Sequence, residues 1–171
     1  MRSGSSLLLV ILCAGFAVAA SAAQAGGKRL KEGSFRVTIQ QDGSWNGFAV
    51  ENRFWIWIAR RKGVFAGNGI LDGLTSRCIS KGRTAHGRST AEIHCENTDP
   101  DGDKIFEVSS EECACDPGGE GGTGEGRFLG GTGKYVGIRG SFRIERKVGP
   151  RDRTERTWTD YVTIVGRWTL P

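Results

Sequence analysis

The stretch Phe35-Arg-Val-Thr-Ile39 alternates apolar and polar side chains, which is the period of a β-strand with one buried face. Further along, Phe54-Trp-Ile-Trp-Ile58 is apolar at every position, which is typical of a central strand. Between the two, Asp42-Gly43 favours a tight turn. No stretch carries apolar residues at helical spacing over three turns, so the sequence predicts an all-β fold.

Other alternating or apolar runs are separated by glycine-rich segments that favour turns, bulges and barrel corners. The expected strands are residues 68–79, 88–97, 104–109, 125–129, 140–146 and 158–169. Together with the two strands above they give eight. Antiparallel strands without a covering helix must close into a barrel or stack as a sandwich, because open sheet edges invite aggregation. We expect an eight-stranded antiparallel β-barrel.

The N-terminal segment has the composition of a secretory signal peptide. Arg2 supplies a positive charge, residues 7–20 are apolar or small, and Ala20-Ser-Ala-Ala-Gln-Ala25 offers cleavage sites of the A-x-A type. A transmembrane anchor needs about 20 apolar residues, and this run is interrupted earlier by small residues. The sequence predicts a signal peptide at 1–25, one β-barrel domain at 26–171, and a secreted or periplasmic protein without a transmembrane anchor.

The cysteines that remain after the predicted cleavage are even in number, which favours disulfides in an exported chain. They are Cys78, Cys95, Cys113 and Cys115. Cys78 and Cys95 flank a polar, turn-like segment at 80–90, so we expect a disulfide that staples neighbouring strands. Cys113 and Cys115 would then close a very small ring or pair in a crossed arrangement. A strained disulfide at that point would support thiol exchange.

Two stretches resemble a known family. They are His94-Cys-Glu-Asn-Thr-Asp-Pro-Asp-Gly-Asp-Lys-Ile-Phe106 and Gly130-Gly-Thr-Gly-Lys-Tyr-Val-Gly-Ile-Arg-Gly140. Both look like the exported bacterial relatives of the allene oxide cyclase barrel, a family that is similar to plant dirigent proteins. The resemblance implies a calycin-like, eight-stranded antiparallel barrel with an apolar cavity, no metal or organic cofactor, and a trimer as in plant members. No plant catalytic residue aligns with a position here, so the resemblance does not transfer an activity.

Strand alternation assigns several side chains to the inner face of the barrel. The expected ligand-pocket residues are Phe54, Ile56, Ile58, Leu74, Trp158, Ile164 and Trp168. Asp72 and Asp160 fall on the same faces, and a carboxyl group in an apolar cavity can serve as a general acid. These two aspartates are the candidate catalytic or ligand-binding groups. The alternative is that each lies at a rim or caps a turn.

Asp99, Asp101 and Asp103 place carboxylates at alternate positions, an arrangement that suits calcium. An EF-hand loop, however, requires glycine one residue beyond Asp103, whereas the glycine here is Gly102. The twelfth position counted from Asp99 is Ser110 instead of glutamate. We therefore expect a tight Asp-Gly turn without a bound ion.

The formal net charge is +5 at pH 7, and a basic cluster lies near the C-terminus. Its members are Arg143, Arg146, Lys147, Arg151, Arg153 and Arg156. Acidic residues interrupt the cluster, whereas nucleic-acid binding needs an unbalanced basic surface with interleaved aromatic residues. We expect a solvated hairpin, or a weak contact with anionic envelope polymers, and no nucleic-acid partner. A hydrolase G-x-S-x-G motif is also missing from the sequence.

Three functions fit this pattern. The first is an exported, non-catalytic barrel that binds a small apolar ligand or assembles with itself. The second is a cofactor-free isomerase or cyclase that acts on an unsaturated, lipid-like substrate. The third is a thiol–disulfide redox protein that uses Cys113 and Cys115. The sequence favours the first function, because many aromatic residues occur without a recognisable catalytic constellation.

Overall fold

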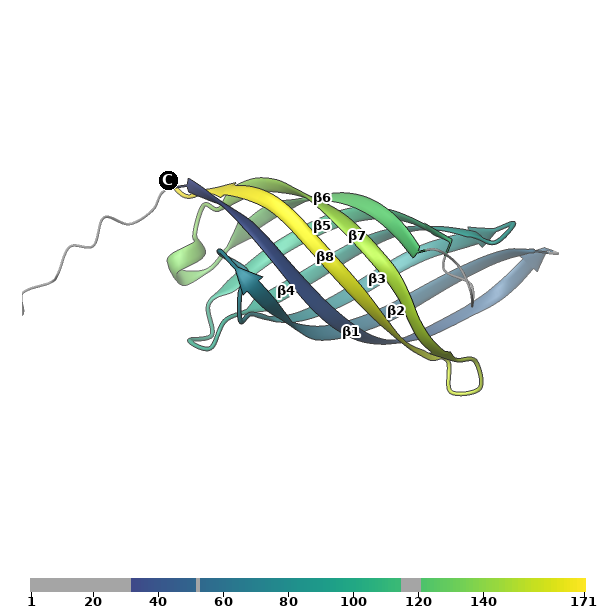
Figure 1. Cartoon of the computed structure of the whole chain (residues 1–171). Coiled ribbons are helices and arrows are strands. Elements are labelled where there is room, and N and C mark those ends of the chain that lie inside the picture. The colour runs from purple at the N-terminus through teal and green to yellow at the C-terminus, as the bar shows by residue number, and fades with distance from the viewer. Residues whose placement is uncertain (1–31, 52, 115–120) are drawn as a thin grey trace, which may run out of the picture.

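The computed structural model describes residues 32–51, 53–114 and 121–171, and these residues form a closed barrel of eight antiparallel strands (Figure 1). The strands are β1 (Glu32–Glu51), β2 (Phe54–Asn68), β3 (Thr75–Ala85), β4 (Arg88–Thr98), β5 (Lys104–Ala114), β6 (Gly121–Gly131), β7 (Arg139–Asp152) and β8 (Thr157–Thr169). Each strand pairs with the next one in sequence, and β8 pairs with β1. The predicted eight-stranded barrel is therefore confirmed. The predicted signal peptide at 1–25 lies outside the described residues.

The short 3-10 helix η1 (Gly133–Tyr135) connects β6 to β7. It lies at the same end of the barrel as the C-terminus, whereas the β1–β2 hairpin extends at the opposite end (Figure 1). In the described part of the chain, no helix is long and apolar enough to cross a membrane.

The predicted turn at Asp42-Gly43 is wrong, because both residues lie inside β1. Gly43 pairs with Trp158 of β8, and a Cβ atom at Gly43 would lie 2.3 Å from Cζ2 of the Trp158 ring. The glycine is therefore needed for the close approach of an aromatic ring from the neighbouring strand. Asp42-Gly43 therefore continues the strand, and the missing side chain of Gly43 leaves room for the Trp158 ring.

The predicted boundaries of the third strand are also wrong. Residues 69–74 form turns, and β3 begins at Thr75. The polar segment at 80–90 mostly belongs to β3 and β4, which are joined by a two-residue turn at His86-Gly87. Both turn residues have positive φ angles, 52° and 78°, as a type I′ hairpin turn requires. Polarity in this segment reflects exposed strand faces rather than a long loop.

An apolar core fills the half of the barrel that contains η1. Its buried members are Phe35, Val37, Ile39, Phe65, Leu71, Leu74, Ile105, Phe128, Tyr135, Ile138, Phe142, Ile144, Val162, Ile164 and Trp168. Phe35, Phe128 and Phe142 pack together with ring centroids 5.5 to 6.4 Å apart. These contacts close this half of the lumen with side chains.

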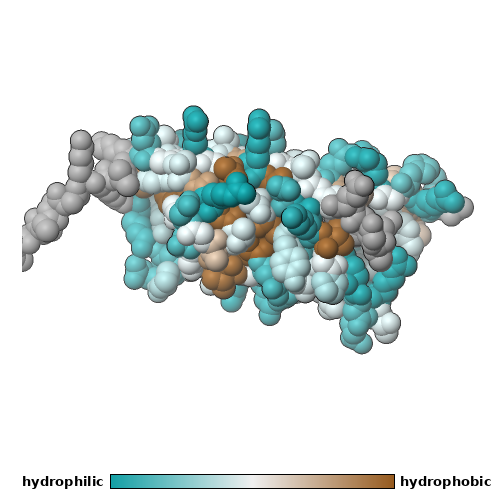
Figure 2. Space-filling view, in the orientation of Figure 1, coloured by the Kyte–Doolittle hydropathy of each residue, from teal (hydrophilic) through white to brown (hydrophobic). Residues whose placement is uncertain are grey.

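The outer wall carries some apolar side chains. On β2, Trp55 and Trp57 line the lumen, whereas the alternating residues Phe54, Ile56 and Ile58 lie on the outer wall. Ile56 and Ile58 are 42% and 59% exposed. Figure 2 shows that apolar side chains also reach the surface on the displayed face, with hydrophilic side chains around them. The trimer implied by the family resemblance stays a prediction.

Cys78 and Cys95 form the predicted disulfide. They stand directly opposite each other in the β3–β4 register, and both side chains are buried beside Ile93. Cys113 is buried on β5, and Cys115 lies outside the described residues. The pairing of the last two cysteines is therefore still a prediction.

Replacing both Cys78 and Cys95 with alanine should lower the free energy of unfolding by roughly 3 kcal/mol, because the crosslink connects residues 17 positions apart. Denaturant unfolding would measure this loss. Wild-type protein under reducing conditions should lose at least as much stability as the double variant, because reduction also cleaves the disulfide predicted for Cys113 and Cys115. An unchanged unfolding midpoint in the double variant would show that the disulfide does not stabilise the fold.

Candidate functional site

The half of the barrel opposite the apolar core contains a cavity of about 820 Å³. Trp45, Trp55, Trp57 and Trp158 line its walls, and its mouth includes residues of the β1–β2, β3–β4 and β7–β8 turns. We call this cavity the tryptophan cup. Its large aromatic surface and its opening to solvent make it the candidate binding site.

Two of the cup tryptophans pack directly against glycines of neighbouring strands. The ring of Trp158 lies over Gly43 of β1, and the ring of Trp57 lies over Gly82 of β3, where a Cβ atom would be 2.4 Å from the ring. Nε1 of Trp57 donates a hydrogen bond to Oγ1 of Thr84 at 3.1 Å. Because the rings approach the wall this closely, space remains in the middle of the cup.

Arginines of the β7–β8 hairpin contact the same aromatic surface. The Arg151 guanidinium lies 5.8 Å from the ring centroid of Trp158, and that of Arg156 lies 5.6 Å from the ring centroid of Trp45. Both distances are within the range of cation–π interactions. The hairpin that the sequence predicts as solvated therefore forms part of the cup mouth.

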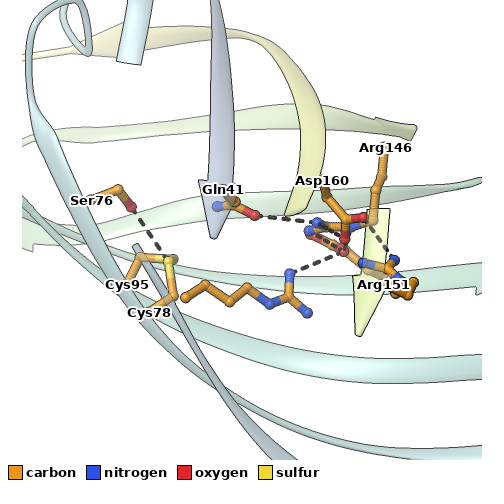
Figure 3. A network of polar contacts seen from close by, with 9 residues as sticks. Gln41, Ser76, Cys78, Cys95, Arg146, Arg151 and Asp160 are labelled. Atoms are coloured by element: carbon orange, nitrogen blue, oxygen red, sulfur yellow. Dashed lines mark hydrogen bonds and ion pairs between the residues drawn. A yellow bond between two sulfur atoms is a disulfide. The ribbon is translucent and has the colours of Figure 1, made fainter. Parts of the chain in front are cut away.

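A layer of charged residues, together with the neutral Gln41, forms the floor of the cup. We define this charged layer as Gln41, Arg61, Glu111, Arg146, Arg151 and Asp160. Arg146 donates from Nε and Nη2 to the two carboxylate oxygens of Glu111, both at 2.8 Å. Its Nη1 donates to Asp160 at 3.1 Å and to Gln41 at 3.2 Å, and Nη2 of Arg151 lies 2.7 Å from the other oxygen of Asp160 (Figure 3).

In this layer, the arginines and the carboxylates stabilise each other's charged forms. Burial by itself lowers the pKa of Arg146, but Glu111 and Asp160 outweigh it and raise that pKa above its usual value. Burial raises the pKa of Glu111, yet Arg146 and Arg61 bring it below its usual value. Arg146 and Glu111 therefore form a buried ion pair with bidentate geometry.

Arg61 has weaker partners than Arg146. Burial lowers the pKa of Arg61 to about 10, and the positive charge of Arg146 acts in the same direction. Its Nη1 lies 3.5 Å from Glu111, at the limit of a hydrogen bond, and its buried Nε has no hydrogen-bond partner within the described chain. Arg61 remains protonated at neutral pH, so its charge is only partly compensated.

The structure brings together only some of the residues that the sequence selects. Asp160 and Trp158 both line the cup. Leu74, Ile164 and Trp168 belong to the apolar core at the other end, and Phe54, Ile56 and Ile58 lie on the outer wall. Asp72 is exposed in the turn after β2, where its Oδ1 accepts a hydrogen bond from the Gly67 amide at 3.0 Å. Asp72 therefore caps a turn, and Asp160 belongs to an ion-pair network.

Sequence reasoning missed Arg61 and Glu111, and it was wrong to place Arg146 in a solvated hairpin, because Arg146 is 3% exposed. The alternation on β7 places Arg146 on the same face as the apolar residues Phe142 and Ile144. This phase could have indicated from the sequence that the Arg146 side chain points into the barrel. The same phase on β5 places Glu107 and Glu111 on the face of Ile105. A charged residue in the apolar phase of a strand is the pattern that identifies this layer.

Glu107 is a second buried acid, and it lies outside the set of cup-lining residues. Burial raises its pKa to about 7, with the neighbouring Asn97 acting in the opposite direction. Oε2 of Glu107 has no hydrogen-bond partner among the described residues. The lumen between the apolar core and the charged layer is therefore polar but incompletely satisfied.

The three aspartates considered for calcium are engaged by protein groups. Oδ1 of Asp99 accepts hydrogen bonds from the amides of Asp101 and Asp103, both at 2.9 Å. The Lys134 ammonium lies 2.6 Å from Asp99 and 2.8 Å from Asp101, and its amide donates to Asp103 at 3.1 Å. The hydrogen bonds from Lys134 hold the pKa of Asp99 below its usual value. A lysine from η1 thus supplies a positive charge at this turn.

Comparisons with known proteins identify a similar structure but no family. No protein-family model matches the chain, and no curated protein matches it. Among solved structures, the chain is similar to the pterocarpan synthase dirigent protein GePTS1, with 11% sequence identity and a TM-score of 0.49. The match covers 83% of this chain and 93% of that one. Functional inference therefore depends on the residues of the cup and the charged layer.

Calcium should leave the melting temperature unchanged, because the Lys134 ammonium already occupies the position between the Asp99 and Asp101 carboxylates. Thermal unfolding with added calcium, and separately with a chelator, measures this. The matched control is Asp101→Asn, which should respond in the same way. An upward shift of several degrees with calcium, abolished in Asp101→Asn, would establish a cation site instead.

Glu107→Gln should become progressively more stable than wild type as the pH rises from 4.5 to about 7. In that range the unfolded chain loses the Glu107 proton while the folded chain retains it, so wild-type stability falls with pH. The difference in unfolding free energy between variant and wild type should grow by about 3 kcal/mol.

Denaturant unfolding across this pH range measures the difference for Glu107→Gln. Glu112→Gln, which removes an exposed carboxylate from the same strand, is the control and should show almost no such change. Parallel pH profiles for wild type and Glu107→Gln would contradict the buried, raised pKa.

Proposed function

We propose that this protein is an exported binding protein whose tryptophan cup holds a small ligand with an apolar body. The observation that carries the proposal is an open, aromatic cavity in a barrel whose other half is filled. Its volume of about 820 Å³ falls within the roughly 300–1,000 Å³ that is usual for small-molecule sites. Tryptophan side chains offer large and rigid contact surfaces at low entropic cost.

The carboxylates at the cup favour binding over acid catalysis. Glu111 and Asp160 are held in ion pairs with arginines. Asp152 accepts hydrogen bonds from the amides of Thr154 and Glu155 and so caps the β7–β8 turn. Each cup-lining carboxylate in the described chain is therefore engaged in an ion pair or in a turn cap. For this reason we prefer a binding protein to an isomerase or cyclase that would need one of these carboxylates as a general acid.

Export is part of the proposal. The Cys78–Cys95 disulfide is typical of proteins that function in an oxidising compartment, and the predicted signal peptide at 1–25 would deliver the chain there. Relationship to the exported bacterial relatives of the allene oxide cyclase barrel is a further proposal, supported by the strand number and topology. The redox alternative depends on Cys113 and Cys115, of which the second lies outside the described residues.

A neutral fluorescent probe, 1-aminoanthracene, tests the binding function. Titration should show saturable binding with quenching of tryptophan fluorescence. Trp57→Ala and Trp158→Ala should each weaken this binding at least tenfold, because each removes a large aromatic contact worth roughly 1.5–3 kcal/mol.

Ile58→Ala is the matched control, since it removes an apolar side chain of the same strand from the outer wall. It should leave the probe affinity unchanged, and circular dichroism should confirm that all variants are folded. Absence of saturable binding, or an equal effect of Ile58→Ala and Trp57→Ala, would refute the proposed site.

A further inference from the structure

The charged layer at the floor of the cup has an excess of positive charge. Within the described residues, it combines the guanidinium groups of Arg61, Arg146 and Arg151 with the carboxylates of Glu111 and Asp160. Three positive charges and two negative charges leave one positive charge without a counterpart. A buried charge is costly unless it is paired. The unpaired positive charge at the floor of the cup therefore favours the binding of an anion.

The excess resides on Arg61. Both oxygens of Glu111 are already engaged by Arg146 at 2.8 Å, so Arg61 reaches the same carboxylate only at 3.5 Å. Both oxygens of Asp160 are engaged as well, by Arg146 and Arg151. Arg61 is 8% exposed, its Nε has no partner in the described chain, and its side chain lines the cup.

The mouth of the cup also has an excess of positive charge. Arg53, Arg153 and Arg156 line it together with a single described carboxylate, that of Asp152. Positive charge along a concave site attracts anions and raises their local concentration. The mouth and the floor therefore select the same ligand charge, while the tryptophans between them contact an apolar body.

We propose that the cup takes compact aromatic carboxylates, with the ligand carboxylate paired to the Arg61 guanidinium at the floor and the ring between the tryptophans. This inference rests on the proposed binding function and adds the charge and the orientation of the ligand. A guanidinium is suited to this role because its parallel N–H groups match the geometry of a carboxylate.

The first arm of the test uses wild-type protein with 2-naphthoate and 2-naphthamide, which share a ring system and differ in charge. Each is titrated by quenching of tryptophan fluorescence and by displacement of 1-aminoanthracene. The naphthoate should bind at least tenfold more tightly, and added salt should reduce this ratio. Equal affinities, or tighter binding of the amide, would overturn the inference.

The second arm uses Arg61→Met, which keeps an unbranched side chain and removes the guanidinium group with its charge. The remaining charged layer then has two positive and two negative charges with their ion pairs intact, so the variant should fold. Arg61→Met should lose the preference for naphthoate and retain the affinity for 2-naphthamide. Arg60→Met, which removes an exposed arginine at the adjacent position on β2, is the matched control and should behave as wild type.

The two proposals fail in different ways. If 1-aminoanthracene does not bind, the cup itself is not a ligand site and both proposals fall. If 1-aminoanthracene binds but Arg61→Met keeps the full preference for naphthoate, only the role of Arg61 is refuted. If Arg61→Met does not fold, Arg61→Lys keeps the charge and should retain a preference for naphthoate over 2-naphthamide, and its failure to do so would count against the inference.

Discussion

The buried guanidinium of Arg146 is the constraint on which the rest of the barrel depends. It is 3% exposed, and its hydrogen-bond partners Glu111, Asp160 and Gln41 come from β5, β8 and β1. A charge placed there requires all of these partners, because removal of one member of a buried pair typically costs about 3–5 kcal/mol. Closure of the barrel in the observed register brings these strands to one point in the lumen, so the polar contacts specify the register as well as the closure.

The charged layer divides the lumen into two parts with different properties. On one side, phenylalanines and aliphatic side chains around Phe35 and Phe142 fill the space, and Trp168 belongs to this packed half. On the other side, the wall is lined by tryptophans that lie over glycines such as Gly43 and Gly82, and the centre stays open. A single strand pattern thus produces a solid half and a hollow half, according to whether inward side chains cross the lumen or lie along its wall.

The sequence was sufficient for the fold class, the strand number and the Cys78–Cys95 disulfide, because alternation and cysteine phase are local signals. It was insufficient for β2, where Phe54 to Ile58 is apolar on both faces and period-two reasoning cannot choose the inner one. In the structure, Ala59 and Arg61 face the lumen in the same phase as Trp55 and Trp57, and because charged residues follow Ile58 in both phases, the sequence does not mark that face as the inner one. Of the charged layer, the sequence selected Asp160 but not the network around it, because partners that are far apart in sequence, such as Arg146 and Glu111, meet only after the barrel closes.

The central claim is that the barrel has one hollow half and one packed half, separated by the charged layer. Fluorine NMR of protein labelled with 5-fluorotryptophan tests it directly, with each resonance assigned by a single Trp→Phe substitution. Addition of 1-aminoanthracene should shift the resonances of Trp45, Trp55, Trp57 and Trp158 and leave that of Trp168 unchanged, because only the first four line the cup. A shift of the Trp168 resonance of similar size, or no shift at the cup tryptophans, would contradict the division of the lumen.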